Sequence, residues 1–247
     1  MLSRVKTSVK RALLGVSIVI VALGLTMGFV VYSAFAHNKA IVDRQVPVPG
    51  VEIVKDGFVS VAMLDAGPEK VALIDAGNDK EAKAILSALA ERKLSPSSVV
   101  AIFLTHGHGD HTAGCRVFGA VPVYAMQDEL PQIGKSVVVT HPLRDGDVTE
   151  IGDLRVEAFA TPGHTAGSAV YFARGVLFFG DSAGGAQDGA MMPAVRFFSK
   201  DPNRNIASLK NLAARLQPRA AEVKMLAFAH SGPLESFQPL ASFASTH

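Results

Sequence analysis

Three histidines and one aspartate lie within six consecutive residues of the segment 105–114, which reads Thr-His-Gly-His-Gly-Asp-His-Thr-Ala-Gly. The four side chains are those of His106, His108, Asp110 and His111. Neutral imidazole nitrogens and carboxylate oxygens are donors that zinc binds, and the glycines between them let a tight loop turn several donors toward one point. The segment therefore predicts a metal site, and metal-dependent hydrolysis is a reaction that such a site supports.

Further histidine and aspartate side chains follow predicted strands later in the chain. Apolar runs that are typical of strands end at Thr105, Ala160, Gly180 and Ala229. Each run is followed within a few residues by a histidine or an aspartate, and beyond the first segment these are His164, Asp181 and His230. Polar side chains at strand ends can converge above one edge of a core, so we expect all seven residues to meet there.

The order of these residues resembles that of the metallo-β-lactamase-fold hydrolases. The shared features are His106-x-His108-x-Asp110-His111, a Thr-Pro-Gly-His-Thr-x-Gly loop around His164, Asp181 after a Phe-Gly strand end, and His230. The resemblance covers about residues 51–235. It implies an α/β fold, a four-layer αβ/βα sandwich, with two Zn²⁺ per chain and with iron or manganese as the alternative metals.

The resemblance also implies a role for each of the seven residues. The first metal would be held by His106, His108 and His164, and the second by Asp110, His111 and His230, with Asp181 bridging the two. A metal-bound water has a pKa near 7, so the attacking group would be a hydroxide shared by the metals and oriented by Asp110. Asp110 is thus expected to be both a ligand and a catalytic residue.

The identity of the bridging residue narrows the expected substrate. Members of this family that hydrolyse antibiotics usually have Cys or Ser where this chain has Asp181, which favours the thioester, lactone and phosphodiester hydrolases. Glyoxalase-II-like members resemble this ligand set but add a C-terminal helical domain, whereas 17 residues follow His230 here. We expect attack on an ester, thioester or lactone-like carbonyl of an extracytoplasmic small molecule. Phosphodiester or β-lactam hydrolysis, or a membrane-tethered metal-binding scaffold without turnover, are the alternatives.

A serine hydrolase is a rival interpretation from another catalytic class. The segment Gly180-Asp181-Ser182-Ala183-Gly184 is a Gly-x-Ser-x-Gly sequence, and Asp201 and His230 follow it in the order of an α/β-hydrolase triad. The residues after Ser182 are rich in glycine where a helix should begin, only 65 residues remain, and the His-rich segment would have no role. The metal site is therefore the preferred interpretation.

The first 36 residues predict a membrane anchor or a signal peptide. Residues 12–36 contain no charge, and as a helix they would extend roughly 37 Å, enough to cross a hydrocarbon core of about 30 Å. Residues 1–11 carry four basic residues and no acid, which predicts a cytoplasmic flank. The triplet Ala34-Phe35-Ala36 resembles a cleavage site, but the apolar run is long for a cleaved signal. We favour an anchor in the cytoplasmic membrane with the catalytic domain outside the cytoplasm, or a periplasmic protein if the segment is cleaved.

Composition restricts the partners. Outside the N-terminal flank the chain has 20 basic and 22 acidic residues, a net charge of −2 that does not predict nucleic-acid binding. We expect a small-molecule substrate and contact with the membrane through the N-terminal segment, with no prediction of oligomeric state. Cys115 is the only cysteine, so no intrachain disulfide can form, and we expect its thiol to serve packing.

The remaining patterns predict a linker at 37–50 and the hydrolase domain at 51–247. An antiparallel meander is expected over 51–55, 58–64 and 70–75, and another strand over 137–140. Helices are expected over 80–93, 126–133 and 203–216, the first capped by Asn78 or Asp79. Asp75 is open to two interpretations, a hydrogen-bond partner of a ligand or a turn residue. The segment 184–205 is predicted to form an apolar substrate wall through Met191, Met192, Phe197 and Phe198.

Overall fold

The computed structural model describes residue 21, residues 24 and 26, residues 28–29 and residues 32–247. The chain contains two compact units, residues 1–37 and residues 38–247. The predicted basic flank and most of the predicted membrane segment 12–36 lie outside the described residues. Within the described part of the chain, no helix has the length and apolar character needed to cross a membrane.

The first sheet of this unit has seven strands in chain order. They are β1 (Gln45–Val48), β2 (Val51–Asp56), β3 (Val59–Asp65), β4 (Val71–Ile74), β5 (Val99–Phe103), β6 (Val123–Met126) and β7 (His141–Leu143). The strands β1 to β4 pair antiparallel, which confirms the predicted meander, and β4 to β7 pair parallel. The predicted strand at 137–140 is wrong because pairing with β6 begins only at Thr140, whose hydroxyl accepts from the Val123 backbone N–H at 2.9 Å.

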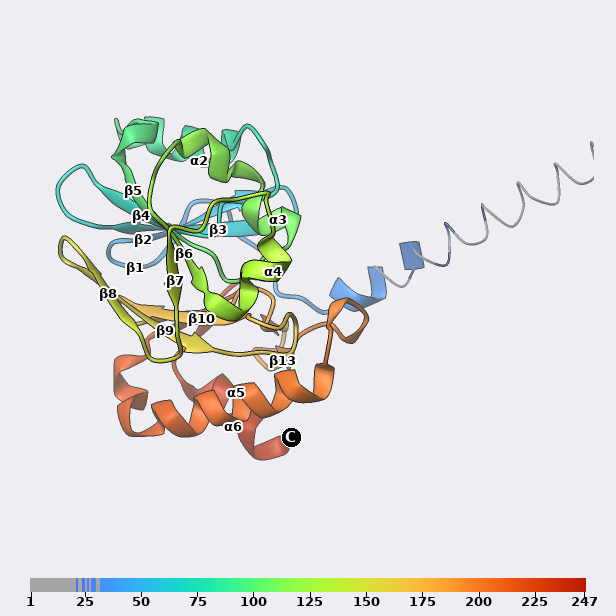
Figure 1. Cartoon of the computed structure of the whole chain (residues 1–247). Helices are drawn as coiled ribbons and strands as arrows, with labels where there is room; N and C mark the ends of the chain where they lie inside the picture. The colour runs from blue at the N-terminus through green and yellow to red at the C-terminus, as the bar shows by residue number, and fades with distance from the viewer. Residues whose placement is uncertain (1–20, 22–23, 25, 27, 30–31) are drawn as a thin grey trace, which may run out of the picture. The chain divides into compact units, whose positions relative to one another are not determined.

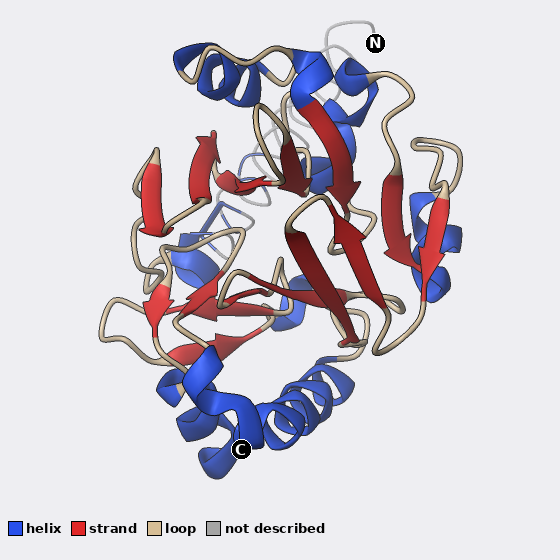
Figure 2. Cartoon of the chain, turned by 90° about the vertical axis from the view of Figure 1, so that its left-hand side faces the viewer, coloured by secondary structure: helices blue, strands red, loops and turns tan. Residues whose placement is uncertain are grey.

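The second sheet has six strands, ordered β15-β14-β11-β10-β9-β8. Their bounds are β8 (Val148–Ile151), β9 (Leu154–Ala160), β10 (Ala169–Ala173), β11 (Val176–Phe178), β14 (Met225–Ala227) and β15 (Leu234–Glu235). A separate two-stranded sheet joins β12 (Ala183–Gly185) to β13 (Met191–Pro193). Figure 2 shows the strands of both main sheets facing each other between helices.

The main core lies between the inner faces of the two sheets. Phe103 from the first sheet and Tyr171 from the second are both fully buried, with ring centroids 5.4 Å apart in an edge-on arrangement. The Tyr171 hydroxyl donates to the Leu104 carbonyl at 2.8 Å, so its polar end is also satisfied. Burying each large apolar side chain contributes roughly 1.5–3 kcal/mol, and this layer fixes the spacing of the sheets.

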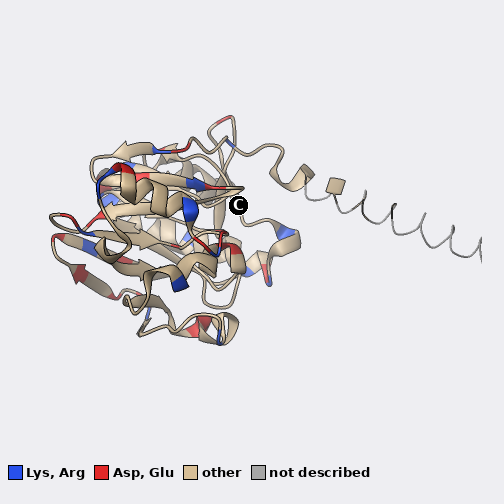
Figure 3. Ribbon diagram, turned by 90° about the horizontal axis from the view of Figure 1, so that it is seen from above, with Lys and Arg blue, Asp and Glu red and all other residues tan. Residues whose placement is uncertain are grey.

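Helices cover the outer face of each sheet. Helix α2 (Lys83–Glu91) packs Ile85 and Leu89 on the first sheet, and α5 (Pro202–Leu216) with α6 (Gln238–Thr246) covers the second (Figure 1). The result is the αβ/βα sandwich. Basic and acidic residues are interspersed along it, as Figure 3 shows.

Helix α2 begins later than predicted. Its N-cap is Ala82, in a left-handed conformation with φ 49°, and no side chain caps it there. The Asp79 carboxylate instead accepts from the backbone N–H groups of Glu81 and Lys83, which stabilises the turn that precedes the helix. The predicted cap residue therefore acts on the approach to the helix.

The shorter helices carry the first histidine segment and its support. The turn α3 (Gly109–Thr112) is followed by a 3₁₀ segment over Ala113–Phe118. A second pair, Gln127–Glu129 in 3₁₀ form and α4 (Leu130–Ile133), follows β6 where a helix was predicted.

Candidate metal centre

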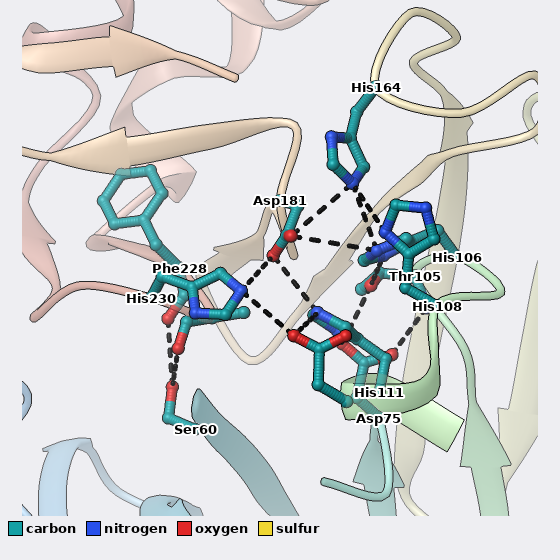
Figure 4. A network of polar contacts seen from close by, with 12 residues as sticks. Ser60, Asp75, Thr105, His106, His108, His111, His164, Asp181, Phe228 and His230 are labelled. Carbon is teal, nitrogen blue, oxygen red and sulfur yellow. Dashed lines mark hydrogen bonds and ion pairs between the residues drawn. The ribbon is translucent and has the colours of Figure 1, made fainter. Parts of the chain in front are cut away.

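The seven predicted site residues lie together at the edge where several strands end. Figure 4 shows the histidines of the site around Asp181. They form two groups, each with ligand atoms within 4.8 Å of one another. The first group is His106, His108, His164 and Asp181, and the second is Asp110, His111 and His230.

Four connections of the sandwich supply these side chains. The first ligand loop, residues 105–108, follows β5 and leads into α3, whose first turn contains Asp110 and His111. The second ligand loop, residues 161–168, joins β9 to β10 and carries His164. Asp181 follows β11 and His230 follows β14, two neighbouring parallel strands of the second sheet.

Backbone hydrogen bonds hold the ends of the two sheets together at this edge. The Ala169 N–H donates to the Thr105 carbonyl at 2.8 Å, and the Ser60 N–H donates to the Ala229 carbonyl at 2.8 Å. Gly180 has a φ of 53°, and a Cβ there would lie 2.3 Å from the Thr105 hydroxyl oxygen. A glycine is therefore required where β11 meets the first ligand loop.

The three imidazoles of the first group face one another with their ring nitrogens. His164 Nε2 lies 3.3 Å from His106 Nε2 and 3.1 Å from His108 Nδ1. Zinc–nitrogen distances of about 2.0–2.1 Å in a tetrahedral site place two ligand nitrogens about 3.3 Å apart. The observed spacing fits three ligands on one metal ion.

Asp181 lies between the two groups and directs one carboxylate oxygen to each. Its Oδ1 is 3.2 Å from Nε2 of both His111 and His230. Its Oδ2 faces the first group, 3.5 Å from His164 Nε2 and 3.8 Å from His106 Nε2. This is the placement that a bridging ligand requires.

Asp110 completes the second group. Its Oδ2 lies 3.5 Å from His230 Nε2 and 3.8 Å from His111 Nε2. Its side chain is 23% exposed, whereas that of His111 is 1% exposed. Asp110 is thus the member of this group that solvent or a substrate reaches most readily.

Two buried atoms show that the donor set suits a cation. Among the residues that the structure describes, His111 Nε2 and Asp181 Oδ1 are buried and have no hydrogen-bond partner. Leaving a buried polar atom unsatisfied costs about 1–3 kcal/mol, so such atoms are uncommon in a stable fold. A divalent metal would satisfy both, and three imidazoles with carboxylates are donors that zinc accepts.

The pKa values differ between the two groups. Burial holds the pKa of His106 well below its usual range and lowers the pKa of His164 to about 4, so these rings are neutral. Burial acts in the same direction on His111 and His230, but the Asp181 carboxylate, with Asp75 or Asp110, outweighs it. The pKa of His111 is raised well above its usual range and that of His230 to about 9.

Asp181 shows the reciprocal shift. Burial alone would raise the pKa of its carboxyl, but His111 and His230 hold that pKa well below the usual range. The carboxylate is therefore ionised. A negative charge at the junction of the two groups favours cations there.

A second layer of contacts orients the ligand rings. Asp75 Oδ2 lies 2.8 Å from His111 Nδ1, and the Asp75 carboxylate also accepts from the Thr105 N–H and hydroxyl, each at 2.8 Å. Asp75 is thus the hydrogen-bond partner of a candidate ligand, the first of the two roles that its sequence left open. Such partners fix the orientation and tautomer of a ligand imidazole.

The other Nδ1 atoms have partners that the sequence did not suggest. The Phe58 carbonyl lies 3.1 Å from His230 Nδ1, and the Ser199 hydroxyl lies 3.4 Å from His164 Nδ1. Glu129 is a further residue of the site that the sequence motifs did not indicate. Its carboxylate is buried beneath both ligand loops. Its only sequence signal is an acidic residue within a predicted amphipathic helix.

The serine-hydrolase triad is not assembled. The Ser182 hydroxyl is buried and lies 3.1 Å from the Thr161 hydroxyl. Asp201 accepts from the Arg204 N–H as the N-cap of α5. His230 faces Asp181 instead. The three residues of the rival mechanism therefore lie in three separate environments.

An exposed phenyl ring lies against the second group, and two more precede a residue that contacts the first. The Phe58 ring is 59% exposed and lies parallel to the His230 ring, with centroids 5.7 Å apart. Phe197 and Phe198 are 60% and 40% exposed and immediately precede Ser199. Met191, also predicted in the apolar wall, is instead buried in the core with α5. The Phe58 ring therefore gives the surface beside the second group an apolar part.

Residues 38–40, within the segment predicted as a linker, are bound to the loop that carries His230. The Asn38 side-chain amide donates to the His230 carbonyl at 2.9 Å, and the Lys39 ammonium donates to the Pro233 carbonyl at 2.8 Å. The Gly232 N–H donates to the Lys39 carbonyl at 2.8 Å. Further on, residues 45–48 of the same segment form β1.

A helix-covered sandwich of two sheets, with histidines and aspartates gathered where its strands end, defines a metallo-hydrolase architecture. A sequence profile of the metallo-β-lactamase superfamily matches residues 54–230, and the chain belongs to this superfamily of metal-dependent hydrolases.

Relatives and solved structures show the same similarity. A hydroxyacylglutathione hydrolase of Salmonella gallinarum is 40% identical over 106 residues, which are 41% of this chain and 39% of that relative. The chain thus spans about two-fifths of the length of the curated relatives it matches. A metallo-β-lactamase family protein of Thermus thermophilus has a TM-score of 0.61 at 22% identity, covering 82% of this chain and 80% of that one.

A subclass B3 metallo-β-lactamase of Bradyrhizobium japonicum also has a TM-score of 0.61, at 17% identity, covering 86% of this chain and 93% of that one. Similarity at this level of identity establishes the shared fold.

Proposed function

We propose that the protein is a dinuclear-zinc hydrolase that cleaves an ester, thioester or lactone-like carbonyl of a small molecule. The observation that carries this proposal is the position of Asp181, whose two oxygens face separate histidine groups. The similarity to hydroxyacylglutathione hydrolases supports a carbonyl substrate. One zinc ion would be held by His106, His108 and His164. The other would be held by Asp110, His111 and His230, and Asp181 would be a ligand of both ions.

Zinc bound there would supply a water of pKa near 7 and would polarise the substrate carbonyl. Asp110 would accept a hydrogen bond from that water and hold it toward the substrate. Burial raises the pKa of the Asp110 carboxyl, but the hydrogen bond to His230 and the charge of His111 outweigh burial and lower this pKa overall. Asp110 is therefore ionised and can accept a hydrogen bond. Asp181 would hold both groups at a fixed separation.

The apolar part of the substrate would bind beside the exposed phenyl rings. Phe58 lies against His230 of the second group, and Phe197 and Phe198 lie next to the Ser199 contact of the first. Contact with either ring surface removes apolar area from water. We therefore infer a preference for substrates with an apolar acyl or leaving group.

We also propose that residues 12–36 anchor the protein in the cytoplasmic membrane, with residues 38–247 outside the cytoplasm. The uncharged run and the basic residues before it support this. Protease added to intact spheroplasts should degrade the unit 38–247, and the mass of the purified protein should equal that of the full chain. A product that lacks about 36 residues would indicate a cleaved signal, and protection from protease would contradict the location.

The test of the enzymatic proposal is the metal content of the full-length protein with a substrate panel. We expect two zinc ions per chain and turnover of thioesters, esters or lactones above that of β-lactams and phosphodiesters. His111→Ala should lose zinc and activity. His141→Ala is the matched control, because His141 lies on β7 and stacks on Tyr124. Two zinc ions without turnover of any substrate would support a scaffold instead, and one iron per chain would contradict the dinuclear-zinc assignment.

A further inference from the structure

A buried carboxylate connects the two ligand loops of the candidate centre. Glu129 is 0% exposed and lies at the end of the 3₁₀ turn Gln127–Glu129. Its Oε1 accepts from the Gly107 N–H at 2.7 Å, in the first ligand loop between His106 and His108. Its Oε2 accepts from the Gly167 N–H and the Thr165 hydroxyl, both at 2.8 Å, in the second ligand loop beside His164.

The glycines that donate to Glu129 also lie directly against the segment 127–133. A Cβ on Gly107 would lie 2.9 Å from the Ile133 backbone nitrogen. A Cβ on Gly167 would lie 2.2 Å from the Glu129 backbone nitrogen. No side chain fits at either contact without movement of the backbone. Both loops therefore pack directly against the segment 127–133, and this segment fixes the distance between them.

The first group depends on that separation more than the second does. His106 and His108 come from the first ligand loop and His164 from the second, so their nitrogens converge only if the two loops keep their relative position. The second group combines α3 with the loop that carries His230. The three side-chain hydrogen bonds of Glu129 go to the two ligand loops.

We propose that Glu129 is a positioning residue that holds the first and second ligand loops together and so sets the zinc affinity of the His106–His108–His164 group. This inference rests on the proposed function, because it takes those histidines to be zinc ligands. A carboxylate suits the task because it can accept all three hydrogen bonds at once. A glutamine of the same shape cannot, since its amide nitrogen would face an N–H or hydroxyl donor.

The experiment measures zinc affinity of the full chain by competition with a chromophoric chelator for wild type and for Glu129→Gln. We expect one of the two zinc ions to bind about 10- to 100-fold more weakly in Glu129→Gln, the range known for residues that orient metal ligands, and the other to be unchanged. Glu52→Gln is the matched control, because Glu52 is also mostly buried but pairs with Arg44 and Arg92. It should leave both affinities unchanged.

Two backgrounds assign the loss to a group. In His230→Ala the loss on adding Glu129→Gln should persist, because the first group is intact. In His164→Ala it should disappear, because that group is already broken. An equal loss at both ions, or a loss that survives His164→Ala, would overturn the proposal.

A separate measurement guards against simple unfolding. The metal-free Glu129→Gln protein should unfold cooperatively, and its zinc affinity should be compared at a temperature where it is folded. Should it not fold, Thr165→Val removes a single donor and should weaken the same zinc ion by a smaller factor; unchanged affinity there would overturn the proposal. Wild type without two bound zinc ions would refute the proposed function, whereas two ions unaffected by Glu129→Gln would refute only this inference.

Discussion

Asp181 Oδ1 and His111 Nε2 lie 3.2 Å apart, both buried, and neither forms a hydrogen bond within the described part of the chain. Burial without a partner is costly for each atom, and the same Asp181 Oδ1 also lies 3.2 Å from His230 Nε2. The folded unit is therefore suited to bind a cation between these atoms. Removing the shared carboxylate should affect both groups at once.

Asp181→Ala should abolish turnover and release zinc. Residues that only orient ligands cost about 10- to 100-fold, and loss of a bridging ligand should exceed that. Zinc content after dialysis and turnover on the preferred substrate give the measurement. A variant that keeps two zinc ions and at least a tenth of the activity would contradict the bridging role.

Asp75→Asn should weaken zinc binding at the second group by about 10- to 100-fold while the fold persists. The change keeps the shape of the side chain but replaces one acceptor oxygen of a carboxylate that serves His111 and Thr105. Chelator competition is the readout. Asp65→Asn offers a comparison, since Asp65 has the same local sequence but pairs with Arg92 at the surface; an equal effect of both changes would argue against a specific role.

Ser182→Ala should leave turnover within about twofold of wild type. Its hydroxyl lies against Thr161 rather than a histidine, so the change removes one buried hydrogen bond at a cost of about 1 kcal/mol of stability. Steady-state kinetics and thermal unfolding measure the two effects. Loss of turnover together with retention of zinc would restore the serine mechanism.

The Cys115 thiol should be unreactive in the folded protein. Burial, with a smaller effect of the Asp75 charge, raises its pKa to about 12, so the nucleophilic thiolate is absent near neutral pH. A disulfide reagent at pH 8 should label the native protein slowly and the denatured protein stoichiometrically. Rapid labelling of the native state would mean that the thiol is accessible.

The same pKa shift gives a pH dependence of stability. A cysteine in the unfolded chain ionises near pH 8.5, so the contribution of the neutral buried thiol is complete below that pH and is lost as pH rises toward about 12. The free energy of unfolding of wild type should therefore fall more steeply in this range than that of Cys115→Ala. Parallel curves for the two proteins would contradict the shift.

The convergence of the seven side chains was predictable because each comes after an apolar run that forms a strand. The role of Asp75 was not, since Leu-Asp-Ala-Gly occurs both at 64–67 and, as Ile-Asp-Ala-Gly, at 74–77. Only the second copy lies beside β5, where the Asp75 N–H donates to the Phe103 carbonyl and the carboxylate reaches His111. Parallel pairing of distant strands decides the difference, and no local pattern carries it.

Other features depended on tertiary contacts in the same way. Glu129 meets loops that are 22 and 38 residues away along the chain, so its role has no local signature. Strand β1 lies in a segment with Pro47 and Pro49, which favours a linker by composition, but it pairs with β2 at the edge of the sheet. Helix α5 was predictable almost to the residue because its apolar face and its Asp201 cap are both local.

The hydrogen bonds of Asn38 and Lys39 connect the first residues of the folded unit to the loop that carries His230 of the candidate centre. Two proteolytic products that differ by only four residues should therefore behave differently. Cleavage after His37 leaves the contacts to His230 and Pro233 in place, whereas cleavage after Ile41 removes them and frees the backbone that carries a candidate ligand. A cut on one or the other side of these contacts would thus decide whether the His230 loop stays bound to residues 38–40.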